Sequence, residues 1–222
     1  MSAELETTET YKTWFEGLKK TVVSTPMVPS DLTEDQRIEI IEGHFAEIMK
    51  ALDLDLSDDS LNRTPYRVAK MYVREIYKGL WDYNFPKITT IKNTMGVDFP
   101  VTEGPIKVMS SCEHHFVTID GFAYISYFPG DKVIGLSKMN RLVNHYARRP
   151  QVQERLTKQI ADAMCYILGV EDVGVWIDAK HYCVASRGIE DQNSRTVTCD
   201  LRGKFRLDPK VREEFMLTVN RR

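Results

Sequence analysis

The sequence lacks a long apolar run, an excess of charge of one sign and a high cysteine content. A helix that spans a bilayer needs about 20 consecutive apolar residues, and no stretch approaches that length. The first ten residues are acidic and polar, without the basic and apolar regions of a secretory signal. We therefore expect a cytoplasmic protein that has no membrane segment.

A formal net charge of only -2 gives the chain no global basic field. General nucleic-acid binding is therefore not expected, and an anionic ligand would have to meet a local cluster of lysine and arginine. The four cysteines are Cys112, Cys165, Cys183 and Cys199, and a reducing compartment does not favour a disulfide framework among them. In a reducing compartment we expect them to be thiols or metal ligands.

Hydrophobic periodicity predicts helices first, then strands, then two helices and further strands. Thr33 and Gln36 have the spacing of a capping box, and Thr64–Pro65 and Ser137 predict two more helix starts. Gly169 is expected to end a later helix. The predicted strands cover residues 88–97, 106–111, 117–128, 173–177, 181–187 and 196–201. Residues 117–128 form either a strand pair, with Asp120–Gly121 as a turn signal, or one long bent strand.

This order of elements predicts an α+β fold in which helices cover one face of an antiparallel sheet. We expect three regions along the chain. Residues 1–31 form a variable, partly helical N-terminal segment, residues 32–85 form a helical region, and residues 86–222 form the main domain.

Three of the five histidines lie in two short segments that also contain cysteine, Ser-Cys-Glu-His-His at 111–115 and His-Tyr-Cys at 181–183. Zinc is bound by thiolate and imidazole, and a catalytic zinc site has three protein ligands and an open position. Cys112, His115 and Cys183 are suited to such a site. On a straight strand Cys112 and His115 would point in opposite directions, so the chain must turn at Glu113.

A turn at Glu113 would leave His114 free to face a substrate. On a strand, His181 and Cys183 share a face, so His181 would stand beside the metal without binding it. This layout is suited to hydrolysis, in which a metal activates water and histidines move protons. Other interpretations stay open: buried structural cysteines, a Cys112–Cys183 disulfide, or a closed four-ligand structural zinc in a non-enzymatic scaffold.

Two pairs of basic residues have helical spacing. Lys138 and Arg141 follow Ser137 at a helix start, where free amide groups favour anions such as phosphate. Arg67 and Lys70 repeat the spacing near another helix start. Such pairs are more commonly solvated helix faces.

Arg187 would share a strand face with Cys183 and so provide a guanidinium near the metal. Glu154, in the first turn of a helix, either interacts with the helix dipole or accepts hydrogen bonds from a donor-rich base edge such as that of guanine. The spacing alone leaves both interpretations of Glu154 open.

Several of these segments together resemble GTP cyclohydrolase I over residues 32–217. The motifs that carry the resemblance are Thr64–Lys70, Ser111–Phe116, Gly135–Lys138, Arg149–Leu156 and His181–Cys183. The resemblance implies the tunnelling fold, in which subunits form a ring whose sheets close into a barrel. It also implies a homodecamer of two pentamers with active sites between subunits.

By the same resemblance, Cys112, His115 and Cys183 are the ligands of Zn2+, and activated water attacks C8 of GTP. His114 would protonate N7, and His181 would assist the ring opening that releases formate. Ser137 would serve the later rearrangement to 7,8-dihydroneopterin triphosphate. The resemblance further assigns substrate binding to Glu154 and Gln153 for the base and to Lys138, Arg141, Arg187, Arg67 and Lys70 for the triphosphate.

Two alternatives to this reaction are a zinc nucleotide hydrolase that does not rearrange its product and the scaffold described above. A deaminase is disfavoured because the sequence lacks a His-x-Glu motif with Pro-Cys-x-x-Cys.

Overall fold

The structure, a computed structural model, describes residues 8–220. Residues 1–7, the start of the predicted N-terminal segment, and residues 221–222 lie outside it. The helices that precede the sheet are α1 (Thr8–Thr21), α2 (Glu34–Ala51) and α3 (Thr64–Met71), followed by short turns at Tyr72–Ile76, Lys78–Leu80 and Asp82–Asn84.

Among the described residues, the main sheet has five strands in the order β5-β2-β3-β6-β7. Their bounds are β2 (Val101–Cys112), β3 (Thr118–Tyr127), β5 (Pro150–Gln151), β6 (Val173–His181) and β7 (Thr196–Leu201); β1 (Thr90–Lys92) and β4 (Lys132–Ile134) form a separate pair. Neighbouring strands of the main sheet are antiparallel except β2 and β5. That parallel pair is short, and it places Cys112 opposite Gln151.

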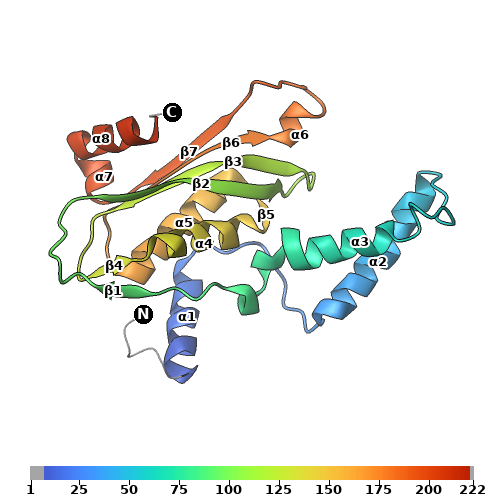
Figure 1. The fold of residues 1–222 in the computed structure, drawn as a ribbon, viewed down its shortest axis with the longest axis horizontal. Coiled ribbons are helices and arrows are strands. Elements are labelled where there is room, and N and C mark those ends of the chain that lie inside the picture. The colour runs from blue at the N-terminus through green and yellow to red at the C-terminus, as the bar shows by residue number, and fades with distance from the viewer. Residues whose placement is uncertain (1–7, 221–222) are drawn as a thin grey trace.

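Helices α4 (Leu136–Ala147) and α5 (Gln153–Leu168) cover one face of the sheet, as Figure 1 shows. The core between them includes Val108, Ile125 and Ile177 of the strands. The predicted α+β fold with helices on a face of an antiparallel sheet is therefore confirmed.

The other face carries a smaller apolar cluster. Tyr124 and Trp176 alternate with the core residues along β3 and β6, so they point away from α4 and α5. They pack with residues of α7 (Lys204–Leu207) and α8 (Pro209–Val219), which lie above the sheet in Figure 1.

Three strand predictions are corrected by the structure. For residues 117–128 the single-strand alternative is confirmed and the turn at Asp120–Gly121 is wrong, because β3 continues through those two residues. The predicted strand at 88–97 shortens to β1. The predicted strand at 181–187 is wrong after its first residue, because β6 ends at His181 and Tyr182–Ala185 forms the helical turn α6.

The helix-start predictions have mixed outcomes. The capping box is confirmed, since the Thr33 hydroxyl accepts from Gln36 N and the Gln36 side chain accepts from Thr33 N. Neither Thr64 nor Ser137 caps its helix; the N-cap positions are Arg63 and Gly135, without a side-chain hydrogen bond. α5 does end at Gly169, whose positive φ of 69° suits glycine.

The N-terminal segment is held against α5. The Tyr166 hydroxyl donates to Trp14 O at 3.0 Å, and Gln159 Nε2 donates to Val23 O at 2.9 Å. α2 and α3 instead pack against each other through Ile38 and Ala69 and project to one side of the sheet (Figure 1). No helix in residues 8–220 is long and apolar enough to cross a membrane.

Candidate functional site

The chain leaves β2 at Cys112 and turns through Glu113–His115 before entering β3. Two backbone hydrogen bonds close the turn, Phe116 N to Cys112 O and Cys112 N to Val117 O, both at 2.8 Å. Phe116 has a positive φ of 54°, which lets the chain reverse within a few residues. The structure therefore has the turn at Glu113 that binding of one ion by Cys112 and His115 requires.

This turn brings three metal-binding side chains together. The ligand atoms of Cys112, His115 and Cys183 all lie within 4.8 Å of one another. Cys112 Sγ is 3.9 Å from His115 Nδ1. Cys183 reaches the cluster from α6 and not from a strand, so the strand-face argument used for it was wrong although the residue does lie there.

The surroundings of the Cys183 thiol disfavour its free thiolate form. Cys112 is only 5% exposed. Burial, together with the neighbouring Cys112 sulfur, raises the pKa of the Cys183 thiol, and the Arg187 guanidinium partly opposes that rise. A divalent cation between the sulfurs would compensate both negative charges. The donor set of two sulfurs and one imidazole is one that zinc enzymes use.

His114 lies beside this cluster and faces solvent. Its side chain is 63% exposed, and its Nδ1 is 3.8 Å from Cys112 Sγ. Glu113 next to it forms an ion pair with Arg155 of α5. Glu113 N also donates to Gln151 O at 3.0 Å, so the turn is attached to both β5 and α5.

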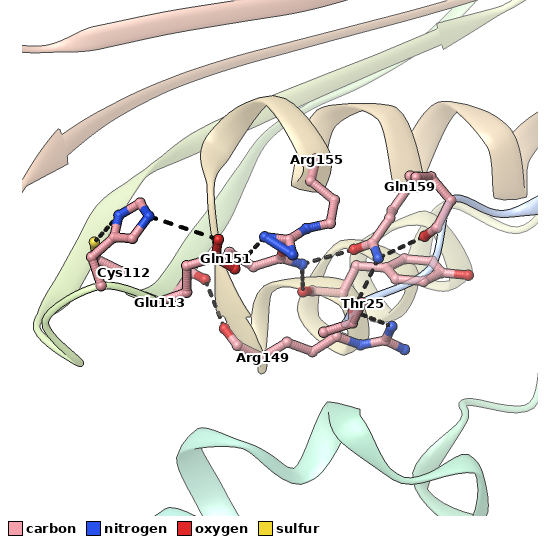
Figure 2. Close-up of polar contacts among 11 residues, drawn as sticks. Thr25, Cys112, Glu113, Arg149, Gln151, Arg155 and Gln159 are labelled. Atoms are coloured by element: carbon pink, nitrogen blue, oxygen red, sulfur yellow. Dashed lines mark hydrogen bonds and ion pairs between the residues drawn. The ribbon is translucent and has the colours of Figure 1, made fainter. Parts of the chain in front are cut away.

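Figure 2 shows that these contacts continue away from the metal cluster. Gln151 lies between Glu113 and Gln159, and its Nε2 donates to Gln159 Oε1 at 2.7 Å. Gln159 Nε2 donates in turn to Thr25 Oγ1 at 3.1 Å. The turn that carries His114 therefore rests on a buried polar layer that extends to the N-terminal segment.

His181 is the last residue of β6 and lies two residues before Cys183. Burial lowers the pKa of its imidazole, and the nearby charge of Glu154 opposes that shift. Its Nε2 is 2.7 Å from Oε1 of Gln153, a side chain that is only 2% exposed. Glu154 itself is exposed at the start of α5, beside a hollow lined by Thr198 and Arg206.

The other predicted residues lie elsewhere in the chain. Ser137 and Lys138 start α4, whereas the end of α4 leads to β5 and the metal cluster. A helix of 12 residues is about 18 Å long. Arg67 and Lys70 are exposed on α3. Arg141, one turn into α4, borders a different hollow with Lys78 and Asn144.

Sequence reasoning missed the supporting residues Arg155 and Gln151. Arg155 is 11% exposed, and a guanidinium that is so buried needs a carboxylate, which Glu113 provides. The sequence held one signal for each partner, a basic residue next to the apolar stripe of a helix and a glutamate without an assigned role. The sequence gives no reason to pair Arg155 with Glu113, because the two residues are 42 positions apart.

The sequence profile of the family described as GTP cyclohydrolase I matches residues 41–220. The chain belongs to the GTP cyclohydrolase I family. Among curated relatives, GTP cyclohydrolase 1 of Enterobacter sp. (strain 638) is 53% identical over 206 residues, 92% of this chain and 93% of the relative. GTP cyclohydrolase 1 of Citrobacter koseri has the same values.

GTP cyclohydrolase 1 of Salmonella arizonae is 54% identical over 199 residues, covering 89% of this chain and 90% of the relative. The resemblance to GTP cyclohydrolase I seen in the sequence motifs is thus confirmed over nearly the whole chain. The family profile begins within α2, so it includes the metal cluster and both flanking histidines.

Proposed function

We propose that this protein catalyses the zinc-dependent hydrolytic opening of the imidazole ring of GTP, releases formate and forms 7,8-dihydroneopterin triphosphate. The observation that carries the proposal is the cluster of Cys112, His115 and Cys183 flanked by two histidines outside it. The names of the relatives, GTP cyclohydrolase 1, support the choice of substrate.

Zn2+ fits the three side chains that would hold it. Two cysteine sulfurs and one imidazole nitrogen come from the turn after β2 and from α6, and their atoms lie within 4.8 Å of one another. Three protein ligands are the number found in catalytic zinc sites. When bound, zinc supplies Lewis acidity that makes water a nucleophile near neutral pH.

The flanking histidines would move protons during ring opening. His114 is exposed next to Cys112, where it would donate a proton to N7 of the purine. His181 lies on the segment that carries Cys183, where it would assist the ring opening that releases formate. Placing two proton-transfer groups on different segments allows each to contact a different part of the ring.

Binding of GTP would use an exposed carboxylate for the base and cations for the phosphates. Glu154, which is exposed at the start of α5, would accept hydrogen bonds from N1–H and the 2-amino group of guanine. Arg187, directly after α6, is near enough to the metal cluster to affect the Cys183 thiol. Lys138, Arg141, Arg67 and Lys70 would bind the triphosphate, and Ser137 would act in the rearrangement.

These last five residues would come from other subunits, in a homodecamer of two pentamers. Ser137 and Lys138 lie a helix length from the metal cluster of their own chain. Along the described chain, β7 ends the sheet and β5 covers only the last two residues of β2, so both edges are open to another copy. The four free cysteines fit a reducing, cytoplasmic location.

Incubation of the purified protein with GTP tests this function. We expect formate and a pterin that becomes fluorescent on oxidation, with activity lost on zinc chelation and restored by Zn2+. Formate with a pyrimidine product alone would contradict the rearrangement. Absence of both products would contradict the whole proposal.

Matched cysteine variants test the metal site in the same assay. Cys112→Ser should lose zinc and turnover, whereas Cys199→Ser, which changes an exposed cysteine of β7, should keep both.

His114→Ala should keep zinc and lose turnover by roughly 100- to 10,000-fold, the usual contribution of a general acid. Loss of zinc in His114→Ala would instead make His114 a ligand.

A further inference from the structure

The side chain of Gln153 lies inside the protein, between α5, β6 and β7. It is 2% exposed, although the resemblance assigns it to substrate binding. Its Nε2 lies 3.2 Å from Ile177 O, 2.9 Å from Thr196 O and 3.1 Å from Thr198 Oγ1. The nitrogen and the oxygen of its side-chain amide are therefore both engaged within the chain.

These contacts fix which end of the amide faces His181. Carbonyl oxygens of Ile177 and Thr196 only accept hydrogen bonds, so the atom next to them must be the amide nitrogen. The oxygen Oε1 is then the atom 2.7 Å from His181 Nε2. The reversed amide would place an acceptor against two carbonyls and leave all three groups unsatisfied.

Two threonine hydroxyls reinforce this orientation. The Thr157 hydroxyl donates to Gln153 O at 2.8 Å, so it has no hydrogen left for Thr198. Thr198 must therefore donate to Thr157 across their 2.6 Å contact. The Thr198 hydroxyl oxygen then accepts from Gln153 Nε2. The hydrogen bonds therefore run in one direction, from the Gln153 side chain through Thr198 and Thr157 back to the Gln153 backbone carbonyl.

The fixed amide determines where the proton of His181 lies. An amide oxygen can only accept, so His181 Nε2 must carry a hydrogen. In the neutral imidazole the lone pair is then on Nδ1. Which nitrogen is protonated is set here by a buried group on another element and not by solvent.

We propose that Gln153 is a positioning residue that holds His181 in the Nε2–H tautomer and leaves Nδ1 as the nitrogen that exchanges protons with the reactants. The tautomer follows from the hydrogen bonds alone, and the role in the reaction rests on the proposed function. Gln153 therefore acts through His181, and Glu154 beside it is the residue that faces outward.

Nitrogen NMR of the zinc-loaded protein labelled with 15N-histidine tests the tautomer. The measurement is made at about pH 8.5, two units above the usual histidine pKa, so that the ring is neutral. We expect a protonated Nε2 and an unprotonated Nδ1 for His181, whose signals are assigned by their loss in His181→Asn. The opposite tautomer, a doubly protonated ring or a metal-bound Nδ1 would overturn the proposal.

Gln153→Met removes the acceptor while nearly keeping the volume of the side chain. It should give a mixture of the two tautomers, keep its zinc and lower kcat with GTP roughly 10- to 100-fold at an unchanged KM. The matched control is Asp162→Asn, which changes another buried polar residue of the same helix, one that pairs with Arg202 away from the metal cluster. The control should keep the His181 tautomer and kcat even if it is destabilised as much as Gln153→Met.

Each result separates the two proposals. A Gln153→Met protein with an unaltered His181 tautomer, or one that raises KM alone, would overturn the positioning role. A wild-type protein with the expected tautomer but no turnover of GTP would contradict the proposed function and leave the tautomer assignment standing.

Discussion

The side chain of His145 illustrates how a buried polar residue depends on its partners. It lies between α4 and the segment after α3, with the Phe85 ring 5.0 Å away and Arg149 Nη2 2.6 Å from its Nε2. Burial, and then the charge of Arg149, lower the pKa of His145 to about 3. The ring is therefore neutral and accepts a hydrogen bond from the guanidinium.

This shift makes His145 a source of acid sensitivity. Its pKa is about 3 when folded and near the ordinary value of 6.5 when unfolded, so the unfolded chain takes up the proton first as pH falls. From pH 7 to pH 5 the free energy of unfolding should fall by about 2 kcal/mol through this residue. His145→Phe should lack that part of the loss, as measured by urea unfolding at both pH values.

The matched control is His44→Phe, which replaces an exposed histidine of α2 in the same way. In this variant the free energy of unfolding should fall between pH 7 and pH 5 by as much as in the unmodified protein. An unchanged dependence in His145→Phe would mean that the ring is already protonated in the folded protein at pH 5.

At the scale of elements, the middle of the sheet depends on a close approach of β3 and β6. Gly121 lies opposite Ala179 and Val108, and a Cβ atom on it would be 2.1 Å from Asp178 O. Any larger residue would separate two central strands. The same strand pair ends with Ile119 opposite His181, so the separation would also disturb the start of α6.

Gly121→Ala should therefore destabilise the protein by about 1–3 kcal/mol, as overpacking in a core does. The midpoint of thermal unfolding should fall by roughly 2–4 °C for each kcal/mol. Gly43→Ala is the control, because nothing lies within 4 Å of a Cβ there and the position is inside α2. It should gain about 1 kcal/mol from helix propensity. Equal melting points for the two variants would contradict the packing argument.

At the scale of the whole molecule, one chain holds only part of the proposed site. The metal cluster, His114 and His181 are together at one end of the sheet. Lys138 lies at the far end of α4. If Lys138 binds the triphosphate as proposed, a complete site needs a second copy of the chain that brings its own α4 to the cluster.

Mixing two inactive variants tests this division. When His114→Ala and Lys138→Ala subunits assemble together in equal amounts, about a quarter of the sites should combine two intact halves. We expect GTP turnover to return to about that fraction of the wild-type rate. A His114→Ala and His181→Ala mixture is the control and should stay inactive, because both residues belong to the same half. Recovery in neither mixture would indicate that one chain forms the complete site.

Local sequence was sufficient where one segment decides the outcome. The pairing of Cys112 with His115 demanded a turn at Glu113, and the chain turns there. The Thr33–Gln36 box also formed, since both hydrogen bonds lie within four residues. Ser137 did not cap α4, although serine is a favoured cap, so propensity alone did not fix the helix start.

Distant contacts could not be read in this way. Apolar residues in 181–187 suit a strand, yet α6 forms there and still brings Cys183 to the cluster. Gln153 looked like a ligand-binding neighbour of Glu154, whereas its amide is enclosed by β6 and β7. The residues next to Cys183 and Gln153 in the sequence predict neither the helical turn α6 nor the burial of the Gln153 amide.

By itself the sequence determined the family, the α+β order of elements and the residue types that can bind a metal, because these depend on composition, spacing and motif. Only the tertiary structure decided that Gln153 faces His181, that Arg155 pairs with Glu113 and that Lys138 lies far from its own metal cluster. The physical reason is that hydrogen bonds and ion pairs form between atoms a few ångströms apart. The fold, and not the distance along the chain, sets which atoms those are.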